Sequence, residues 1–307
     1  MKSKNEINHV SDTALWVAAY RALESKKTNA LFKDEFAQIL IGQLGKGLAS
    51  YTQGSRYTAW SVVIRTLIID ELISKILENP FSEIDTILNL GAGLDTRPYR
   101  MSLPQKINWI EADFPQIIDL KNEKLDRFTP NCQLKRIAID LTDIDKRKKF
   151  LTEISDKSKN ILVLTEGVIP YLTNKQAESL ACDLYALQNF KLWITEYYSP
   201  EILKFLRTPK RLKQMENSPF LFYPDHWFNF FKERGWKEEV TKYFGIETLK
   251  YGRTPPTPGW IKELIIKDES IENIAKHQKL IQTYLGYSLY QRNDCTQFIS
   301  VELTGKD

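Results

Sequence analysis

The stretch Ile87-Leu88-Asn89-Leu90-Gly91-Ala92-Gly93-Leu94-Asp95-Thr96-Arg97 decides the fold of this 307-residue chain. An apolar run of strand length meets a glycine turn, and the turn opens a segment with the character of a helix. In α/β folds a ligand binds where such a strand gives way to such a helix. We therefore expect the functional site at this turn, and its chemistry depends on which ligand fits there.

Further strands follow the glycine turn, and helical stretches separate them. We predict strands over 86–90, 108–113, 134–140, 160–167 and 191–196, with helices over 117–128, 145–154 and 174–187. This alternation is typical of a parallel, doubly wound α/β sheet. Two later strands, near 237–244 and at 297–303, bring the predicted sheet to seven strands.

The segments that flank this predicted sheet lack its alternation of strands and helices. Residues 1–80 contain helical stretches over 12–48 and 59–77 and are predicted to form an N-terminal helical cap on a core of residues 81–307. Segments at about 199–236 and 246–295 lack a regular strand pattern or are rich in proline. They are expected to form a lid after the fifth strand that contacts the substrate.

Composition argues against several classes of protein. The net charge of +4 gives no case for a nucleic-acid partner, and the three cysteines contain no CxxC pair that would predict a metal site or a disulfide framework. The most apolar window, 62–77, carries four charged residues and is too polar to span a bilayer. We expect a reduced cytoplasmic protein without a signal peptide, membrane or metal, and the oligomeric state stays open.

Arg65 shares one face of a predicted helix with apolar residues such as Ile69 and Leu72. Its helical neighbours three and four positions away include no acid. A cation on a buried face needs a partner, because desolvating it alone is costly. That partner must be a distant acid or an anionic group of a ligand, unless the side chain reaches solvent at the rim of the core.

The glycine turn departs from the dinucleotide fingerprint, because Thr96 stands where GxGxxG has its third glycine. Asp95 in the tight turn would also repel a pyrophosphate, unless Arg97 neutralises it. A ligand with an ammonium and a sulfonium but no phosphate is compatible with this carboxylate. S-adenosylmethionine is such a ligand.

Polar residues match that ligand group by group. Glu111 and Asp113 end the second strand, where an acid binds a ribose diol, and Asp140 ends the third strand, where an acceptor can meet the adenine amino group. Arg65 can meet the carboxylate of the ligand, and Glu166 can meet its ammonium. Each acid alone is an ordinary strand-end residue, but together they supply groups for one cofactor.

The sequence resembles the leucine carboxyl methyltransferase superfamily of class I methyltransferases. Within it, the chain is most similar to a microbial branch of S-adenosylmethionine-dependent methyltransferases that includes polyketide carboxyl O-methyltransferases. The matching stretches are residues 13–19, 65–70, 89–97, 111–115, 140–141 and 166–172, with 251–253 near the end. The resemblance implies a seven-stranded, mostly parallel class I methyltransferase sheet with an N-terminal cap and a lid.

The resemblance also implies a cofactor-binding set, which is Arg65, Gly91, Gly93, Asp113, Asp140, Leu141 and Glu166. In that order, the arginine would grip the methionine carboxylate, the glycines would approach the methionine part, and the first aspartate would hold the ribose diol. The second aspartate and the leucine backbone would read the adenine. The glutamate would lie near the amino-acid end.

The acceptor is less well defined. The tyrosine after the fifth strand of the phosphatase-directed enzymes has no clear match, because Glu196 and Tyr197 stand near that place, which argues against a phosphatase substrate. His226 is the only histidine among aromatic residues of the expected lid, although a helix-face histidine without a catalytic role is the simpler interpretation. These three residues are the substrate candidates, and no catalytic residue is assigned.

We predict an S-adenosylmethionine-dependent O-methyltransferase that acts on a carboxylate, or a hydroxyl, of a small molecule such as a natural product. A carboxylate is favoured because it is already a nucleophile and needs no general base. One alternative is a catalytically silent protein that binds the cofactor and regulates a partner. Another is a nicotinamide-dependent oxidoreductase, which Asp95 and Thr96 disfavour.

Overall fold

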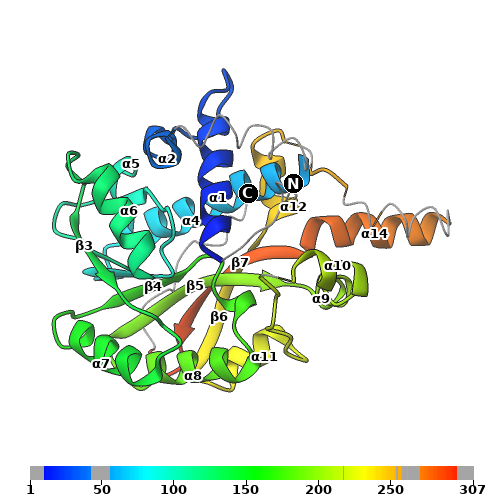
Figure 1. The fold of residues 1–307 in the computed structure, drawn as a ribbon. Helices are drawn as coiled ribbons and strands as arrows, with labels where there is room; N and C mark the ends of the chain where they lie inside the picture. The colour runs from blue at the N-terminus through cyan, green and yellow to red at the C-terminus, as the bar shows by residue number, and fades with distance from the viewer. Residues whose placement is uncertain are drawn as a thin grey trace.

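The computed structural model describes residues 10–42, 56–216, 218–253, 255–257, 261 and 270–295. Its centre is a seven-stranded sheet with the order β3-β2-β1-β4-β5-β7-β6 (Figure 1). The strands are β1 (Thr86–Leu90), β2 (Asn108–Asp113), β3 (Gln133–Ala138), β4 (Ile161–Thr165), β5 (Phe190–Tyr198), β6 (Trp236–Tyr243) and β7 (Leu285–Arg292). The first five are parallel, and β7 is antiparallel to both of its neighbours. The predicted doubly wound, mostly parallel α/β sheet is confirmed.

The order of the strands switches sides at β1, with β2 and β3 on one side of it and β4 and β5 on the other. Strand β2 pairs with β1 on one side and β4 pairs with it on the other, so that Leu90 lies opposite Ala112 and Thr165. Every residue of β1 and of β4 is buried, because helices cover both faces of the sheet. The carboxyl ends of β1, β2 and β4 therefore meet at one edge, which is where α/β folds bind ligands.

Helices pack on both faces of the sheet (Figure 1). One face carries α7 (Ile144–Ser155), α8 (Asn174–Tyr185) and α11 (Trp227–Lys232), and the other carries α4 (Arg56–Glu78) and α12 (Phe244–Lys250). The buried ring of Trp193 contacts Phe231 and Trp236 at centroid distances of 5.2 and 5.5 Å. The remaining elements are α5 (Arg97–Arg100), α6 (Pro115–Leu125), η2 (Ile169–Tyr171), α9 (Pro200–Leu206), α10 (Pro209–Gln214) and α14 (Ile271–Thr283).

Two N-terminal helices, α1 (Val10–Ser25) and α2 (Glu35–Ile41), pack against one another and against the glycine turn. Figure 1 shows α1 standing over the strand ends. Arg253 ties this cap to the C-terminal part of the chain, because its Nη2 donates to the Asn29 carbonyl at 2.9 Å and to Glu24 at 3.2 Å. The helices predicted at 59–77 and in 12–48 are thus present, with a break between α1 and α2.

The strand predicted at 297–303 lies outside the described residues. The seventh strand of the sheet is β7 at 285–292, inside the stretch that the sequence assigned to the lid. Strand β7 is buried along most of its length but carries Ser288, Gln291 and Arg292, which satisfy their polar groups through contacts such as Ser288 with Thr241 at 2.7 Å. These polar residues interrupt the apolar pattern that predicts a buried strand.

No helix in the described part of the chain is both long enough and apolar enough to cross a bilayer.

The third strand ends at Ala138, two residues earlier than predicted, so Asp140 lies in the loop after β3. Much of the predicted lid over 199–236 is helical, in α9, α10 and α11. Of the second lid segment, residues 254, 258–260 and 262–269 lie outside the described residues.

Candidate cofactor site

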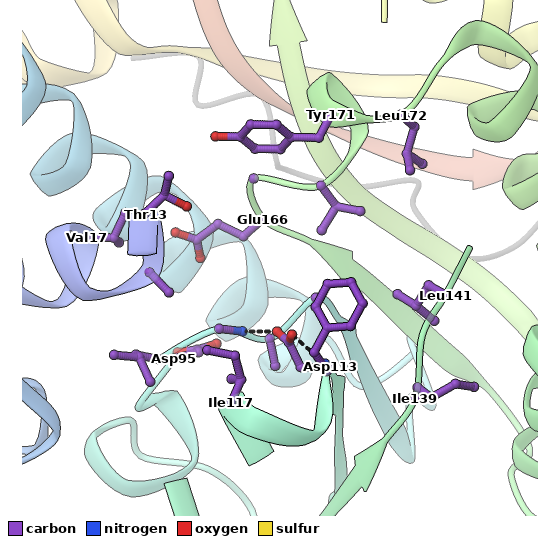
Figure 2. A pocket seen from close by; sticks show the side chains of 18 of the residues that line it. Thr13, Val17, Asp95, Asp113, Ile117, Ile139, Leu141, Glu166, Tyr171 and Leu172 are labelled. Atoms are coloured by element: carbon purple, nitrogen blue, oxygen red, sulfur yellow. Dashed lines mark hydrogen bonds between the residues drawn. The ribbon is translucent and has the colours of Figure 1, made fainter. Parts of the chain in front are cut away.

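A cavity of about 330 Å³ opens at the carboxyl ends of β1 to β4 (Figure 2). This volume lies in the range of small-molecule sites. All seven residues of the predicted cofactor-binding set line this one cavity. The full lining is Thr13, Ala14, Val17, Arg21, Arg65, Gly91, Ala92, Gly93, Leu94, Asp95, Asp113, Phe114, Ile117, Ile139, Asp140, Leu141, Thr142, Glu166, Gly167, Val168, Tyr171 and Leu172.

Asp113, the last residue of β2, is fixed by two backbone donors (Figure 2). Its Oδ2 accepts from the Gly93 N–H at 2.6 Å, and its Oδ1 accepts from the Phe114 N–H at 2.7 Å. Burial raises the pKa of this carboxyl group, and the two hydrogen bonds oppose that rise. Each oxygen keeps a lone pair, so the carboxylate can still accept two hydroxyl donors, as a ribose diol requires.

Glycine is required in the turn at Gly91. Its φ is +67°, and an added Cβ would lie 2.5 Å from Val168 Cγ2 in the loop after β4. The backbone of the β1 turn therefore approaches the β4 loop more closely than any side chain would allow. Gly93 also has a positive φ, of +49°, and its N–H points at Asp113.

Glu166 supplies the partner that Arg65 lacks locally. Arg65 Nε lies 2.9 Å from Glu166 Oε1, and Arg97 Nη1 lies 2.8 Å from Glu166 Oε2. Burial alone would raise the pKa of Glu166, but the two guanidinium groups hold it below its usual value. Arg65 makes no other polar contact within the described part of the chain, so its two terminal nitrogens keep donors for an anion beside the cavity.

The repulsion argument from Asp95 does not hold. Arg97 Nη1 lies 2.9 Å from Asp95 Oδ2, Asn89 Nδ2 donates to the same oxygen at 2.8 Å, and Asp95 is 6% exposed. Burial would raise the pKa of Asp95, but Arg97 keeps it well below its usual value, so the carboxylate is ionised and its charge is balanced. The absence of a third glycine at Thr96 remains the sequence argument against a dinucleotide.

The two ends of the cavity differ in polarity. Figure 2 shows Glu166 and Thr13 at one end and Ile139 and Leu141 at the other. At the apolar end, Asp140 accepts from the backbone N–H and the hydroxyl of Thr142, at 2.9 and 2.7 Å. An apolar slot with a carboxylate at its edge fits a purine, while the charged end fits an amino-acid group.

Glu111 does not belong to the cavity. It is 0% exposed and forms ion pairs with Lys121 at 2.8 Å and Arg136 at 3.1 Å. Of the two acids predicted for the ribose diol, only Asp113 lines the cavity. The alternation of strand residues explains this difference. Glu111 and Asp113 point to the same side of β2, but only the residue at the strand end reaches the open edge of the sheet.

None of the three substrate candidates lines the cavity. Glu196 is buried and accepts hydrogen bonds from the backbone N–H groups of Gly167 and of Val168, the latter at 3.1 Å. Tyr197 stacks on Phe228 with the ring centroids 4.9 Å apart. His226 is exposed and precedes the first turn of α11. Glu196 thus supports the loop that lines the cavity, while the other two side chains lie elsewhere.

Two groups of cavity residues were not predicted from the sequence. Helix α1 contributes Thr13, Ala14, Val17 and Arg21, none of which belongs to the predicted cofactor-binding set. Tyr171 of η2 also faces the cavity (Figure 2). Burial raises the pKa of its phenol, while Arg65 and a hydrogen bond with Thr13 lower it. In the described ranges, no group of three His, Cys, Asp or Glu side chains is placed to hold a metal ion.

Comparison with known proteins identifies the family of this chain. A family model described as leucine carboxyl methyltransferase matches residues 14–184. A Mycobacteroides abscessus protein provisionally named S-adenosyl-L-methionine-dependent methyltransferase is 31% identical over 196 residues, which are 58% of this chain and 62% of that protein. A Streptomyces coelicolor protein of the same description is 30% identical over 55% of this chain and 62% of its own length. The matched region thus spans about three-fifths of these relatives.

Solved structures agree on the fold. A DUF574 family protein from Streptomyces avermitilis aligns with a TM-score of 0.52 and 10% identity, over 84% of this chain and 95% of that one. A protein from Thermobifida fusca, provisionally described as a methyltransferase, aligns with the same TM-score and 12% identity, over 83% and 92%. At this level of identity the likeness concerns the fold alone, which is that of the class I methyltransferases.

Proposed function

The chain belongs to the leucine carboxyl methyltransferase family, and from this premise we propose that it is an S-adenosylmethionine-dependent O-methyltransferase that methylates a carboxylate of a small molecule. The observation that carries the proposal is the gathering of all seven predicted cofactor residues around one cavity with a charged end and an apolar end. The three cysteines form no disulfide, which agrees with a cytoplasmic protein.

The cavity residues fit S-adenosylmethionine, which supplies a methyl group on a positively charged sulfur. Arg65 keeps two unpaired amino groups at the polar end for the methionine carboxylate. Asp113 keeps acceptor capacity for the ribose diol, and Asp140 stands at the edge of the apolar slot for the adenine. Gly91 and Gly93 remove side-chain bulk where the backbone of the turn meets the ligand.

The choice of a carboxylate acceptor rests on Asp95, Glu166 and Tyr171 of the cavity lining, none of which is suited to act as a general base. Asp95 and Glu166 are held by Arg97, and their pKa values lie below the usual range, so neither takes up a proton readily at neutral pH. The pKa of Tyr171 is raised, so its phenol stays protonated. A hydroxyl acceptor would need help to lose its proton, whereas a carboxylate is ionised at neutral pH.

Calorimetric titration with S-adenosylhomocysteine tests the cofactor half of the proposal. We expect binding by the wild type and a loss of about tenfold or more in affinity for Arg65→Ala and Asp113→Ala, since each removes a charge-assisted contact. Arg56→Ala, an exposed arginine at the start of α4, is the control and should bind normally. Equal affinity of all four proteins, or no binding by the wild type, would contradict the proposed site.

A second titration, with NAD, addresses the oxidoreductase alternative, because the balanced charge of Asp95 removes one objection to a pyrophosphate. Tight NAD binding without S-adenosylhomocysteine binding would favour the oxidoreductase over our proposal.

Transfer of a labelled methyl group from the cofactor to a metabolite extract distinguishes an enzyme from a silent binding protein. Base-labile label in the product would identify a carboxyl ester, as we expect.

A further inference from the structure

The hydroxyl of Thr96 explains why the third glycine of the turn is missing. Thr96 Oγ1 donates to Asp34 Oδ2 at 2.8 Å, and both residues are 0% exposed. Asp34 lies in the N-terminal cap, where its other oxygen accepts from the Ala37 N–H at 2.9 Å and begins α2. A glycine at position 96 could not make this contact, so the sequence anomaly has a partner on another element.

Arg21 of α1 completes the same buried cluster. Its Nε lies 2.8 Å from Asp34 Oδ2, and its Nη2 donates to the backbone carbonyl of Leu94. Arg21 and Leu94 both line the cavity, whereas Asp34 and Thr96 lie behind its wall. The three side chains of Arg21, Asp34 and Thr96, which we call the cap latch, thus fasten α1 and α2 to the glycine turn at two points.

The latch fixes one wall of the cavity. Thr13, Ala14 and Val17 lie on the helix that Arg21 anchors, and they face the strand ends across the cavity. Figure 2 shows Thr13 and Val17 on the side of the cavity opposite Leu141. If α1 moved away, the cavity would lose this wall, and a ligand would lose its contacts with it.

We propose that Asp34 and Thr96 are positioning residues for the cofactor, which hold α1 in place as a wall of the cavity without touching the ligand. This inference rests on the proposed function, because it takes the cavity as the cofactor site. A ligand that binds only while α1 is docked has an apparent affinity reduced by the fraction of molecules in which α1 is undocked. Weakening the latch therefore lowers the affinity for the ligand, although Asp34 and Thr96 do not touch it.

Thr96→Val tests the latch, because valine keeps the shape of threonine and removes the hydroxyl. We expect its affinity for S-adenosylhomocysteine, measured by calorimetry well below the melting temperature, to fall several-fold. The upper limit is about tenfold, which is reached when loss of one hydrogen bond to a charged group leaves α1 mostly undocked. Thr96→Ser, which keeps the hydroxyl, should restore most of the affinity.

Thr86→Val is the matched control. Thr86 is also 0% exposed, and its hydroxyl donates to Ser158 at 2.9 Å, but it begins β1 at the end opposite the cavity. We expect Thr86→Val to lower the melting temperature about as much as Thr96→Val and to leave the affinity unchanged. Equal affinity of Thr96→Val and wild type, or equal losses in both variants, would overturn the inference.

Hydrogen exchange separates failure of the latch from failure of the proposed function. Without ligand, backbone amides of α1 should exchange faster in Thr96→Val than in the wild type and in Thr86→Val, and added S-adenosylhomocysteine should slow them. Unchanged exchange in α1 overturns the latch whether or not the ligand binds. A wild type that does not bind S-adenosylhomocysteine overturns the proposed function, and the positioning role falls with it.

Discussion

Glu196, near the end of β5, accepts a hydrogen bond from the backbone N–H of Val168 across 3.1 Å. The same Oε1 accepts from the Gly167 N–H, and Thr195 Oγ1 donates to the other oxygen at 2.8 Å. One buried carboxylate therefore fixes the loop that follows β4. Because Glu166 begins this loop, a residue outside the cavity controls the position of a residue inside it.

Glu196→Gln should weaken cofactor binding without removing any group from the cavity. The amide keeps the size of the side chain but replaces a charged acceptor by a weaker one, and its NH₂ group faces other donors. We expect a stability loss of about 1–3 kcal/mol and a several-fold loss in affinity for S-adenosylhomocysteine. Urea unfolding and calorimetry measure the two effects, and Glu153→Gln, at an exposed position of α7, should change neither.

The ion pairs of Glu166 predict a dependence of stability on pH. Its pKa is lowered in the folded protein, so the native state binds fewer protons than the unfolded state once the pH falls below about 4.3, the ordinary value for a glutamate. The stabilisation is present above that pH and is lost as the pH falls through the lowered pKa. In Glu166→Gln, urea unfolding between pH 7 and pH 3 should therefore show a shallower loss of stability.

Asp113→Asn should change the dependence of stability on pH in the opposite direction. Burial raises the pKa of Asp113, so its contribution to stability falls as the pH rises above the ordinary aspartate value. Removing this carboxyl group should make the rise of stability with pH steeper. The same direction of change in both variants would contradict the assignment of these two pKa shifts.

Alanine at Gly91 and at Gly167 separates backbone strain from a clash. Both glycines have a left-handed backbone, with φ of +67° and +72°, but a Cβ meets Val168 only at position 91. We expect Gly167→Ala to cost about 1–2 kcal/mol and Gly91→Ala about 1–3 kcal/mol more. Val168→Ala in the Gly91→Ala background should recover part of the loss, as measured by urea unfolding.

Lys121 and Glu111 form an ion pair in which both side chains are 0% exposed. Lys121→Met leaves the carboxylate with Arg136 as its remaining cation and should lower the free energy of unfolding by about 3–5 kcal/mol. Lys124→Met, on the same helix, removes a pair whose partners are 39% and 69% exposed, and it should have an effect below about 1 kcal/mol. Similar losses of stability in both variants would show that the buried ion pair contributes no more to stability than the exposed one.

The cofactor half of the site could be predicted because its residues sit at fixed offsets from regular strands. Gly91 and Glu166 each follow a predicted strand and Asp113 ends one, and parallel strands bring their carboxyl ends together. The bounds of β1 and β2 were predicted to the residue. The matching residues of the family supplied the roles.

The remaining features depend on contacts between distant segments. The ion pair of Arg65 with Glu166 crosses from α4 to the loop after β4, and the hydrogen bond of Thr96 with Asp34 crosses from the glycine turn to the cap. No periodicity within one segment reveals such pairs. His226 lies outside the cavity, since its aromatic neighbours in the sequence pack inward while its own side chain faces solvent.

The adjacency of β1 and β4 has a consequence for how binding competence arises during folding. The glycine turn and Glu166 lie next to one another only after β4 pairs with β1, and α5, β2, α6, β3 and α7 lie between them in the sequence. Such non-local pairing forms slowly, because a long loop must close before its contacts stabilise it. A refolding chain should therefore gain secondary structure before it gains affinity, and bound S-adenosylhomocysteine would report the final assembly of the sheet.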